Sequence, residues 1–247
     1  MKNTLKLATY FGIPVKIHFT FPLILLAFGM EGWVRGGVVE ALRGTLLVLF
    51  VFVCVVLHEL GHSLQARRFG IGVRDIVLLP IGGVARAERI PENPWQEIAV
   101  AIAGPLVNFA LATVFFVVVW IKGTGLDFED GFFSSLLLIN LVLGTFNLVP
   151  AFPMDGGRIL RGLLATRMPY LRATRFAKDI GQLIALFFAV VGFLYTKLVM
   201  LPLIAVAIFY GAINEEKMIH ARLRIRSTSV EDELADDRGS ADEQSWR

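Results

Sequence analysis

Long, predominantly apolar runs constrain this chain more than any other feature of its sequence. Three of them extend from Gly44 to Leu57, from Ile98 to Ile121 and from Leu198 to Ala212. A run of about 18–20 mostly apolar residues matches the thickness of the hydrocarbon core of a bilayer. Hydrophobic residues make up 55% of the chain, above the roughly 45–50% that is usual in a soluble domain. The sequence therefore predicts a polytopic membrane protein and not a soluble enzyme.

The apolar runs divide into six predicted membrane helices, separated by glycines, prolines and charged residues. The fold class that we expect is an all-α membrane protein, a polytopic bundle of about six transmembrane helices. The apolar stretch from Ile17 to Phe28 is not followed by a small-x-small cleavage site, so we expect it to remain as the first span. The approximate bounds of the six spans are residues 17–35, 43–65, 96–121, 133–150, 180–197 and 198–214.

The distribution of positive charge predicts how these helices are oriented. If the N-terminus is cytoplasmic, residues 1–16, 66–95, 151–179 and 213–247 are also cytoplasmic, and they contain 20 of the 24 Lys and Arg residues. Cytoplasmic loops of membrane proteins carry an excess of these residues. We therefore expect a multi-pass protein of the cell membrane with both termini in the cytoplasm. The lipid bilayer is an expected partner, nucleic acid is not, and the sequence does not indicate an oligomeric state.

Two segments outside the spans have their own character. Residues 71–92 contain short apolar stretches on either side of a Pro and Gly turn, which predicts a small β-hairpin or sheet near the cytoplasmic face, with an ordinary surface loop as the alternative. Residues 215–247 are charged and end in a polar, acidic stretch with too little apolar surface to fold. We therefore expect a membrane domain of residues 1–214 followed by a disordered cytoplasmic tail. Cys54 is the single cysteine, which excludes an intramolecular disulfide.

The stretch His58-Glu59-Leu60-Gly61-His62 carries the clearest chemistry in the sequence. Side chains four positions apart on a helix share a face, so His58 and His62 can bind one zinc ion at about 2.0–2.1 Å. Glu59 then lies beside the metal as a candidate general base. A charged residue in the middle of a span costs about 2.5–3.5 kcal/mol, and metal coordination offsets this cost for the histidines. The alternative is a helix end where these side chains merely reach cytoplasmic water.

A catalytic zinc ion usually has three protein ligands and one open position. Asp155 is the candidate for the third ligand because it lies in the segment Asn147–Arg158, where two prolines stop a helix and two glycines permit a tight bend. Such a segment could place a carboxylate at membrane depth. His18 and His220 are weaker candidates in interfacial segments, and an Asp-Gly turn or helix cap is the alternative for Asp155.

In these motifs the chain resembles the site-2 protease family of intramembrane zinc metalloproteases, which are peptidases of the M50 type. The resemblance rests on the histidine motif on one helix and the Asn147–Gly157 stretch on a later one. The segments Pro80–Gly83 and Gly104–Asn108 also fit the family. No PDZ-type insertion and no C-terminal CBS pair are expected, because the outer loops and the segment after the last span are too short.

The resemblance implies a site and an activity. One zinc ion per chain would be held by His58, His62 and Asp155, with Glu59 as general base and Asn147 binding the substrate or the oxyanion, as a side-chain amide can. Members of the family cut single transmembrane helices, typically of membrane-tethered regulators or remnant signal peptides. The glycine-rich strand region after Pro80 could pair with an unwound substrate as an added strand. The alternative functions are a metal transporter, which predicts ionisable residues through the full bilayer, and a non-catalytic scaffold that binds membrane segments.

Overall fold

The computed structural model describes residues 4–80, 82–89, 91, 93–123, 125–128, 131–195, 201–219 and 221. These residues are mostly helical and include one four-stranded sheet. They form two compact units. The first contains the residues up to Pro150 together with Met154–Thr166, and the second contains Ala151–Pro153 and the residues from Arg167 onwards. The expected combination of apolar helices with a small sheet is confirmed.

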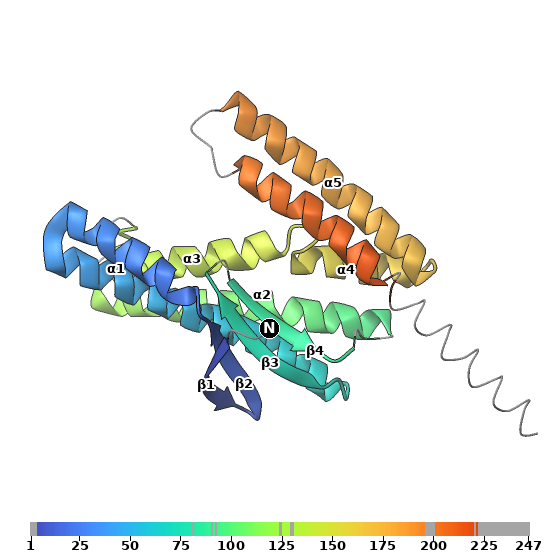
Figure 1. Cartoon of the computed structure of the whole chain (residues 1–247), viewed down its shortest axis with the longest axis horizontal. Coiled ribbons are helices and arrows are strands. Elements are labelled where there is room, and N and C mark those ends of the chain that lie inside the picture. Colours follow the sequence, from blue (N-terminus) through green and yellow to red (C-terminus); the bar gives the residue numbers. More distant parts are fainter. Residues whose placement is uncertain are drawn as a thin grey trace, which may run out of the picture. The chain divides into compact units, whose positions relative to one another are not determined.

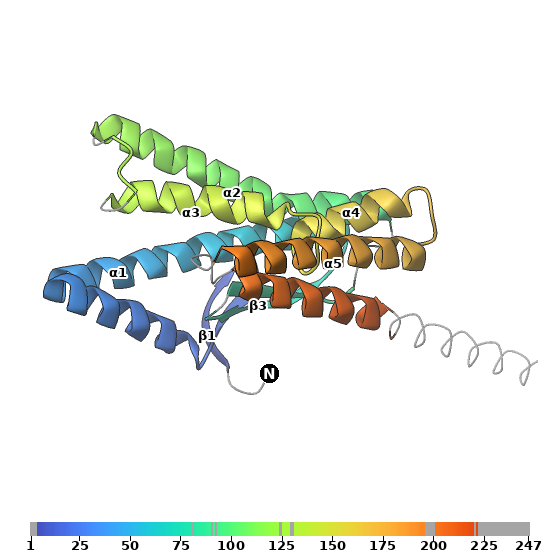
Figure 2. The same ribbon diagram turned by 90° about the horizontal axis from the view of Figure 1, so that it is seen from above.

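Helix α1 (Phe21–Arg68) is a hairpin of two antiparallel limbs, shown in blue and cyan in Figures 1 and 2. Its backbone leaves the helical conformation at Gly36 and Gly37, and Gly37 has a φ of 71°, which glycine adopts at little cost. The limbs pack closely near this bend, because a Cβ on Gly32 would lie 2.4 Å from the carbonyl oxygen of Glu40. The two limbs correspond to the first two predicted spans.

Four further helices and one additional helical segment follow. Helices α1, α2 and α5 are long and apolar enough to cross a membrane, and α3 is a shorter apolar helix. Large apolar side chains lie on the outside of these helices, and Val34 and Phe193 are more than four-fifths exposed. Exposed apolar surface of this kind suits contact with lipid. Three helices among the described residues are both long enough and apolar enough to span a membrane, so the count of six spans stays a prediction. The elements are α2 (Pro94–Lys122), α3 (Phe132–Asn147), α4 (Asp155–Ala165), α5 (Tyr170–Leu194) and the helical residues 201–219.

In the second unit, α5 and the helix at residues 201–219 lie side by side, in orange in Figures 1 and 2. Glu216 pairs with Lys178 at 3.1 Å and with Arg175 at 3.5 Å. Helix α5 begins at Tyr170, earlier than the predicted fifth span, because its first turns carry charged residues that a search for apolar runs assigns to a loop. The last helix continues to residue 219, past the predicted start of the tail. Residues beyond 221 lie outside the described part of the chain.

The sheet has the strand order β1-β2-β3-β4. Strands β3 and β4 form the predicted hairpin, whereas β1 and β2 were not predicted. Strands β2 and β3 pair in parallel, and parallel neighbours need a crossover connection, which here is the whole of α1. Helix α1 therefore begins and ends beside the sheet. The strands are β1 (Thr4–Tyr10), β2 (Ile13–His18), β3 (Val73–Leu79) and β4 (Gly82–Ala87).

The core of the first unit lies between this sheet and α1. Ile13, Val15 and Ile76 from β2 and β3 are almost completely buried, and they share one apolar cluster with Phe52 and Leu60 of α1. A slip by one residue would turn the apolar side chains of a strand away from the helix, so this contact fixes the register of the sheet. The sheet is thereby locked onto the limb of α1 that carries the histidine motif.

An ionic cluster joins β2, β3 and β4. The side chain of Asp75 is 2% exposed, and it accepts hydrogen bonds from Lys16 Nζ at 2.6 Å and from Arg86 Nε at 2.5 Å. The hydrogen bond from the guanidinium of Arg86 lowers the pKa of Asp75 most, and Lys16 lowers it further. Burial of the carboxylate raises the pKa, and the net result is a pKa of about 2. The ionised carboxylate therefore stabilises the pairing of three strands.

We expect Asp75→Asn to lower the free energy of unfolding by about 2 kcal/mol at neutral pH. A carboxyl group whose pKa is lowered by folding stabilises the fold above its unfolded pKa of about 4, and the contribution is lost as the pH falls to about 2. Thermal unfolding in detergent should therefore show a gap between wild type and variant that closes below about pH 4. A gap that persists at about pH 2 would mean that the charge is not its cause.

Candidate metal centre

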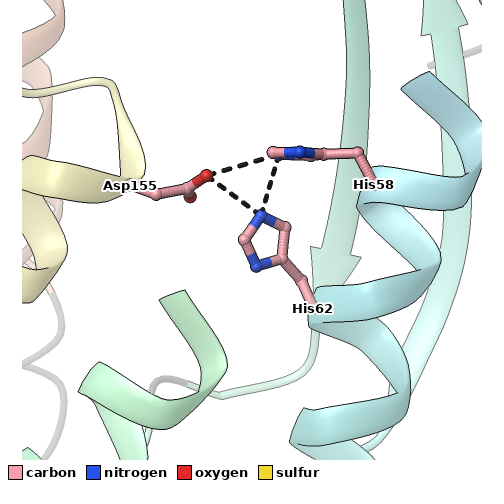
Figure 3. A group of neighbouring side chains, drawn as sticks. All are labelled: His58, His62 and Asp155. Carbon is pink, nitrogen blue, oxygen red and sulfur yellow. Dashed lines mark hydrogen bonds and ion pairs between the residues drawn. The ribbon is translucent and has the colours of Figure 1, made fainter. Parts of the chain in front are cut away.

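His58 and His62 lie one helical turn apart on the second limb of α1, and their rings face the same point (Figure 3). The Nε2 atoms of the two rings are 3.1 Å apart. Both side chains are buried. The spacing of four residues thus places both imidazoles on one face of a helix, as the sequence predicted.

Asp155 is the first residue of α4 and is buried as well. Its Oδ2 atom lies 3.1 Å from Nε2 of His62 and 3.3 Å from Nε2 of His58 (Figure 3). The carboxylate and the imidazoles come from different helices, and His62 and Asp155 are 93 positions apart in the sequence. The structure thus brings the three predicted ligands together, and all of them belong to the first unit.

The three atoms suit a zinc ion in both geometry and chemistry. They form a triangle with sides of 3.1–3.3 Å, and tetrahedral ligands at about 2.0–2.1 Å from zinc are about 3.3–3.4 Å apart. Nδ1 of His62 lies 2.7 Å from the carbonyl oxygen of Val100, which can only accept, so Nδ1 carries the proton and Nε2 keeps a lone pair. Lone pairs that converge in a buried place can be satisfied by a cation that they share.

Two glycines make room for this arrangement. A Cβ on Gly104 of α2 would lie 2.2 Å from Nε2 of His62 and 2.7 Å from Nε2 of His58. A Cβ on Gly156, next to Asp155, would lie 2.2 Å from the carbonyl oxygen of Val149. Close packing of the backbone at the start of α4 therefore requires a glycine at position 156, and Gly104 leaves space beside the two imidazoles.

A buried ion pair holds α4 against α2. Nε of Arg161 donates to Oε1 of Glu97 at 2.8 Å, and neither side chain is more than 3% exposed. The same helices also approach closely at Gly162, where a Cβ would lie 2.7 Å from Cγ1 of Ile98. Because Asp155 begins α4, these contacts help to position the residue that is predicted as the third ligand. Neither member of the ion pair was predicted from the sequence.

Glu59 follows the first histidine, and its carboxylate lies against β4. Oε2 accepts a hydrogen bond from the backbone N–H of Ala85 at 3.2 Å, and a Cβ on Gly83 would lie 2.9 Å from Cγ of Glu59. The sheet therefore positions the side chain that the sequence nominates as general base. Its catalytic role stays a prediction.

The other residues considered from sequence are placed as follows. Asn147 is the last residue of α3 and is partly exposed, and its contact with a substrate stays a prediction. Nδ1 of His18 lies 2.8 Å from the hydroxyl of Thr20, and His18 does not belong to the metal group. His220 lies outside the described residues. Of the three candidates for the third ligand, Asp155 is thus the one that the structure places beside the histidine pair.

One buried asparagine contacts His58 and a second contacts the first, and neither was given a role from the sequence. Oδ1 of Asn108 lies 2.5 Å from Nδ1 of His58, and Nδ2 of Asn108 donates to Oδ1 of Asn140 at 2.9 Å. Both side chains are completely buried. A signal was present, because each is an amide in an otherwise apolar helix, where a polar group is expensive to bury.

Comparison with known proteins assigns the family. The model of peptidase family M50 matches residues 46–131 and 129–191, a region that includes the histidine motif and Asp155. This chain belongs to peptidase family M50. A zinc metalloprotease of Methanocaldococcus jannaschii is 36% identical over 232 residues, which cover 94% of this chain and 66% of that relative. Stage IV sporulation protein FB of Bacillus subtilis is 32% identical over 163 residues, which cover 65% of this chain and 52% of that relative.

A solved structure also matches this M50 chain. It is a site-2 protease from Methanocaldococcus jannaschii, with a TM-score of 0.62 and 38% identity over 86% of this chain and 95% of that chain. The predicted membership of the site-2 protease family of zinc metalloproteases is confirmed, and zinc is the metal that the family implies for the three ligands. The matched region spans about two thirds of the length of the Methanocaldococcus zinc metalloprotease and about half of the length of the Bacillus sporulation protein.

Proposed function

We propose that this chain is an intramembrane zinc endopeptidase that hydrolyses peptide bonds within or near transmembrane segments of other proteins. The position of the metal centre carries this proposal. His58 and His62 lie on α1, a helix apolar enough to cross a membrane, and they converge with Asp155 in a buried group. The proposed partner is a transmembrane helix of a membrane-tethered regulator or a remnant signal peptide. The proposed process is regulated intramembrane proteolysis.

The proposed roles of the residues follow from their chemistry. Zinc, when bound, acts as a Lewis acid toward the scissile carbonyl and lowers the pKa of water. Glu59 accepts a proton from the attacking water and donates it to the leaving amine. The amide of Asn147 donates a hydrogen bond to the oxygen on which negative charge develops. His58 and His62 direct Nε2 toward the metal, because their Nδ1 atoms are occupied by other partners.

We also propose six membrane spans with both chain ends in the cytoplasm. The two limbs of α1, together with α2, α3, α5 and residues 201–219, supply six apolar helical segments. The excess of Lys and Arg in the segments assigned to the cytoplasm supports this orientation, and it would put the sheet on the cytoplasmic side. A reporter fused to either end of the chain should respond as a cytoplasmic protein, and an external location of either end would contradict the topology.

The outer edge of β4 is the proposed binding place for an unwound substrate. This strand is at one end of the sheet. Backbone N–H groups alternate in direction along a strand. The backbone N–H of Glu88 donates to the carbonyl of Gly72, the residue before β3, whereas the backbone N–H of Ala85 donates to the side chain of Glu59. The N–H groups of Gly83 and Ala87 therefore also face away from β3, where an added strand would pair with them beside the general base.

Ala87→Pro tests this edge because proline removes one outward-facing N–H and leaves the pairing with β3 intact. A lost hydrogen bond costs about 1 kcal/mol, so we expect cleavage to slow by about fivefold to tenfold while zinc binding is unchanged. Ala87→Ser keeps the N–H and should cleave like wild type. The measurement is the cleavage rate of a membrane substrate together with zinc content, and equal rates for both variants would exclude pairing at this position.

The alternatives make different demands on the structure. A metal transporter needs ligands along a path, whereas the described residues contain one group of His, Cys, Asp and Glu side chains that could hold a metal. A non-catalytic scaffold has no use for an acid–base group, yet Glu59 directly follows a ligand and is positioned by the sheet. Both observations favour hydrolysis.

The decisive experiment reconstitutes the purified chain in liposomes with a tagged single-span membrane protein. The proposal expects zinc-dependent cleavage, with fragment masses that place the cut inside or beside the apolar span. A transporter would instead carry zinc across the liposome membrane without cleaving the substrate. A scaffold would bind the substrate and leave it intact, and either of these results would overturn the proposal.

A further inference from the structure

A line of buried polar side chains leads from His58 across α2 into α3. Nδ1 of His58 contacts Oδ1 of Asn108, whose Nδ2 donates to Oδ1 of Asn140. Nδ2 of Asn140 in turn donates to the carbonyl oxygen of Leu136 at 2.9 Å and contacts the sulfur of Cys54 at 3.4 Å. An unpartnered buried amide costs roughly 1–3 kcal/mol, so burial of these two asparagine side chains is tolerated only because each has hydrogen-bond partners.

The direction of every hydrogen bond in this line is determined at its far end. The carbonyl of Leu136 has no proton and can only accept, so it must face the NH₂ group of Asn140. The oxygen of Asn140 then faces Asn108 and must accept, which requires the NH₂ group of Asn108 there. The oxygen of Asn108 is left facing His58, and it also can only accept. Nδ1 of His58 must therefore be the donor.

The proton on Nδ1 decides which nitrogen of His58 can bind metal. A neutral imidazole has one N–H and one lone pair, and with the proton on Nδ1 the lone pair is on Nε2. Nε2 is the atom that lies 3.3 Å from Asp155 and 3.1 Å from His62. His62 reaches the same state by a shorter route, because its Nδ1 faces the carbonyl of Val100 directly.

We propose that Asn108 and Asn140 are a positioning pair that fixes the tautomer and the ring orientation of His58 for zinc. The backbone carbonyl of Leu136 is the anchor that gives the pair its direction. The pair makes a metal ligand on α1 depend on α3, a helix that supplies none of the three ligands. This inference rests on the zinc site of the proposed function, and it adds two residues that act through a ligand without touching the metal.

The test measures zinc affinity of the purified full chain in detergent, by competition with a chromophoric chelator and without any substrate. Asn140→Leu keeps the size of the side chain but removes the directing groups, and we expect the affinity for zinc to fall by about tenfold to a hundredfold. Asn108→Leu should have a similar effect. The double variant should bind zinc no more weakly than the weaker single variant, because Asn140 acts only through Asn108.

Two controls separate positioning from general damage. Ser135→Ala, in the helix that carries Asn140, removes a side-chain hydrogen bond of 3.0 Å to the carbonyl of Gly131, the residue before α3, and zinc affinity should not change. Asn140→Asp should retain an affinity within about threefold of wild type, because a buried carboxyl keeps its proton and can donate to Leu136 while accepting from Asn108. This second variant preserves the direction of the line and gives a result even if Asn140→Leu fails to fold.

A spectroscopic measurement reports the tautomer itself. ¹⁵N NMR of histidine-labelled, zinc-free protein should show the His58 proton on Nδ1 in wild type and a mixture of tautomers in Asn140→Leu. Unchanged zinc affinity in Asn140→Leu, or additive losses in the double variant, would overturn the inference. If wild type itself bound no zinc, the proposed function would fail as well, whereas a wild type that binds zinc beside unaffected variants would defeat the positioning pair alone.

Discussion

Glu59→Gln should slow cleavage by about 10²-fold to 10⁴-fold, the range that a positioned general base contributes. Glutamine has the same shape, and its side-chain oxygen can still accept the hydrogen bond that Ala85 N–H donates to Glu59. It cannot take a proton from water or deliver one to the leaving amine. The three ligands are untouched, so zinc content should stay the same. Single-turnover cleavage of a tagged membrane substrate, combined with metal analysis of the same preparation, gives both quantities.

Glu31→Gln is the matched control for this change. It removes a carboxylate from the same helix, but Glu31 is exposed and pairs with Arg35 one turn away. The control should cleave at the wild-type rate. A Glu59→Gln variant that kept the wild-type rate would exclude Glu59 as the base, and one that lost zinc would show that the substitution disturbs the metal site.

Gly104→Ala should weaken zinc binding by about a hundredfold or more, beyond the usual effect of losing one outer partner of a ligand. The added methyl group would lie 2.2 Å from Nε2 of His62 and 2.7 Å from Nε2 of His58, closer than atoms in contact can be. Either the imidazoles must turn away from Asp155 or α2 must move away from α1. Zinc affinity, measured by chelator competition, reports both outcomes.

The fold itself should tolerate this substitution, because alanine in a helix is favoured over glycine by about 1 kcal/mol. Gly181→Ala makes the same chemical change in α5, where the new Cβ would meet its nearest neighbours at 3.4 Å, an ordinary contact. This control should keep both zinc and thermal stability. If Gly104→Ala bound zinc like wild type, the space beside the histidines would not be needed for the metal.

The three candidate ligands that the structure brings together could be named from the sequence because the patterns around them are local. The spacing between His58 and His62 already determines that they share a helical face. The prolines and glycines around Asp155 indicate that its carboxylate lies outside a regular span. The approximate places of the long apolar helices were predictable for a similar reason. A bilayer-spanning run is recognised by its length and composition alone.

What the sequence did not reveal depends on partners that are distant in the chain. Strand β2 is a strand because it pairs with β3, and residues Val15 and Ile76 that face each other there are separated by all of α1. The roles of Asn108 and Asn140 likewise depend on which side chain each one meets across a helix interface. Helix α4 has a charged sequence and buries Arg161 only because Glu97 of α2 is opposite. No local pattern contains this information.

Because His62 and Asp155 are 93 positions apart in the sequence, a metal bound to both also constrains the chain, beside its chemical role. An ion held at both positions is a reversible cross-link, and it closes a loop whose closure would otherwise cost entropy. Because zinc binds the folded chain in preference to the unfolded one, mass action couples the stability of the protein to the free zinc concentration. A cell short of zinc would then contain fewer folded molecules of this protein as well as fewer loaded ones.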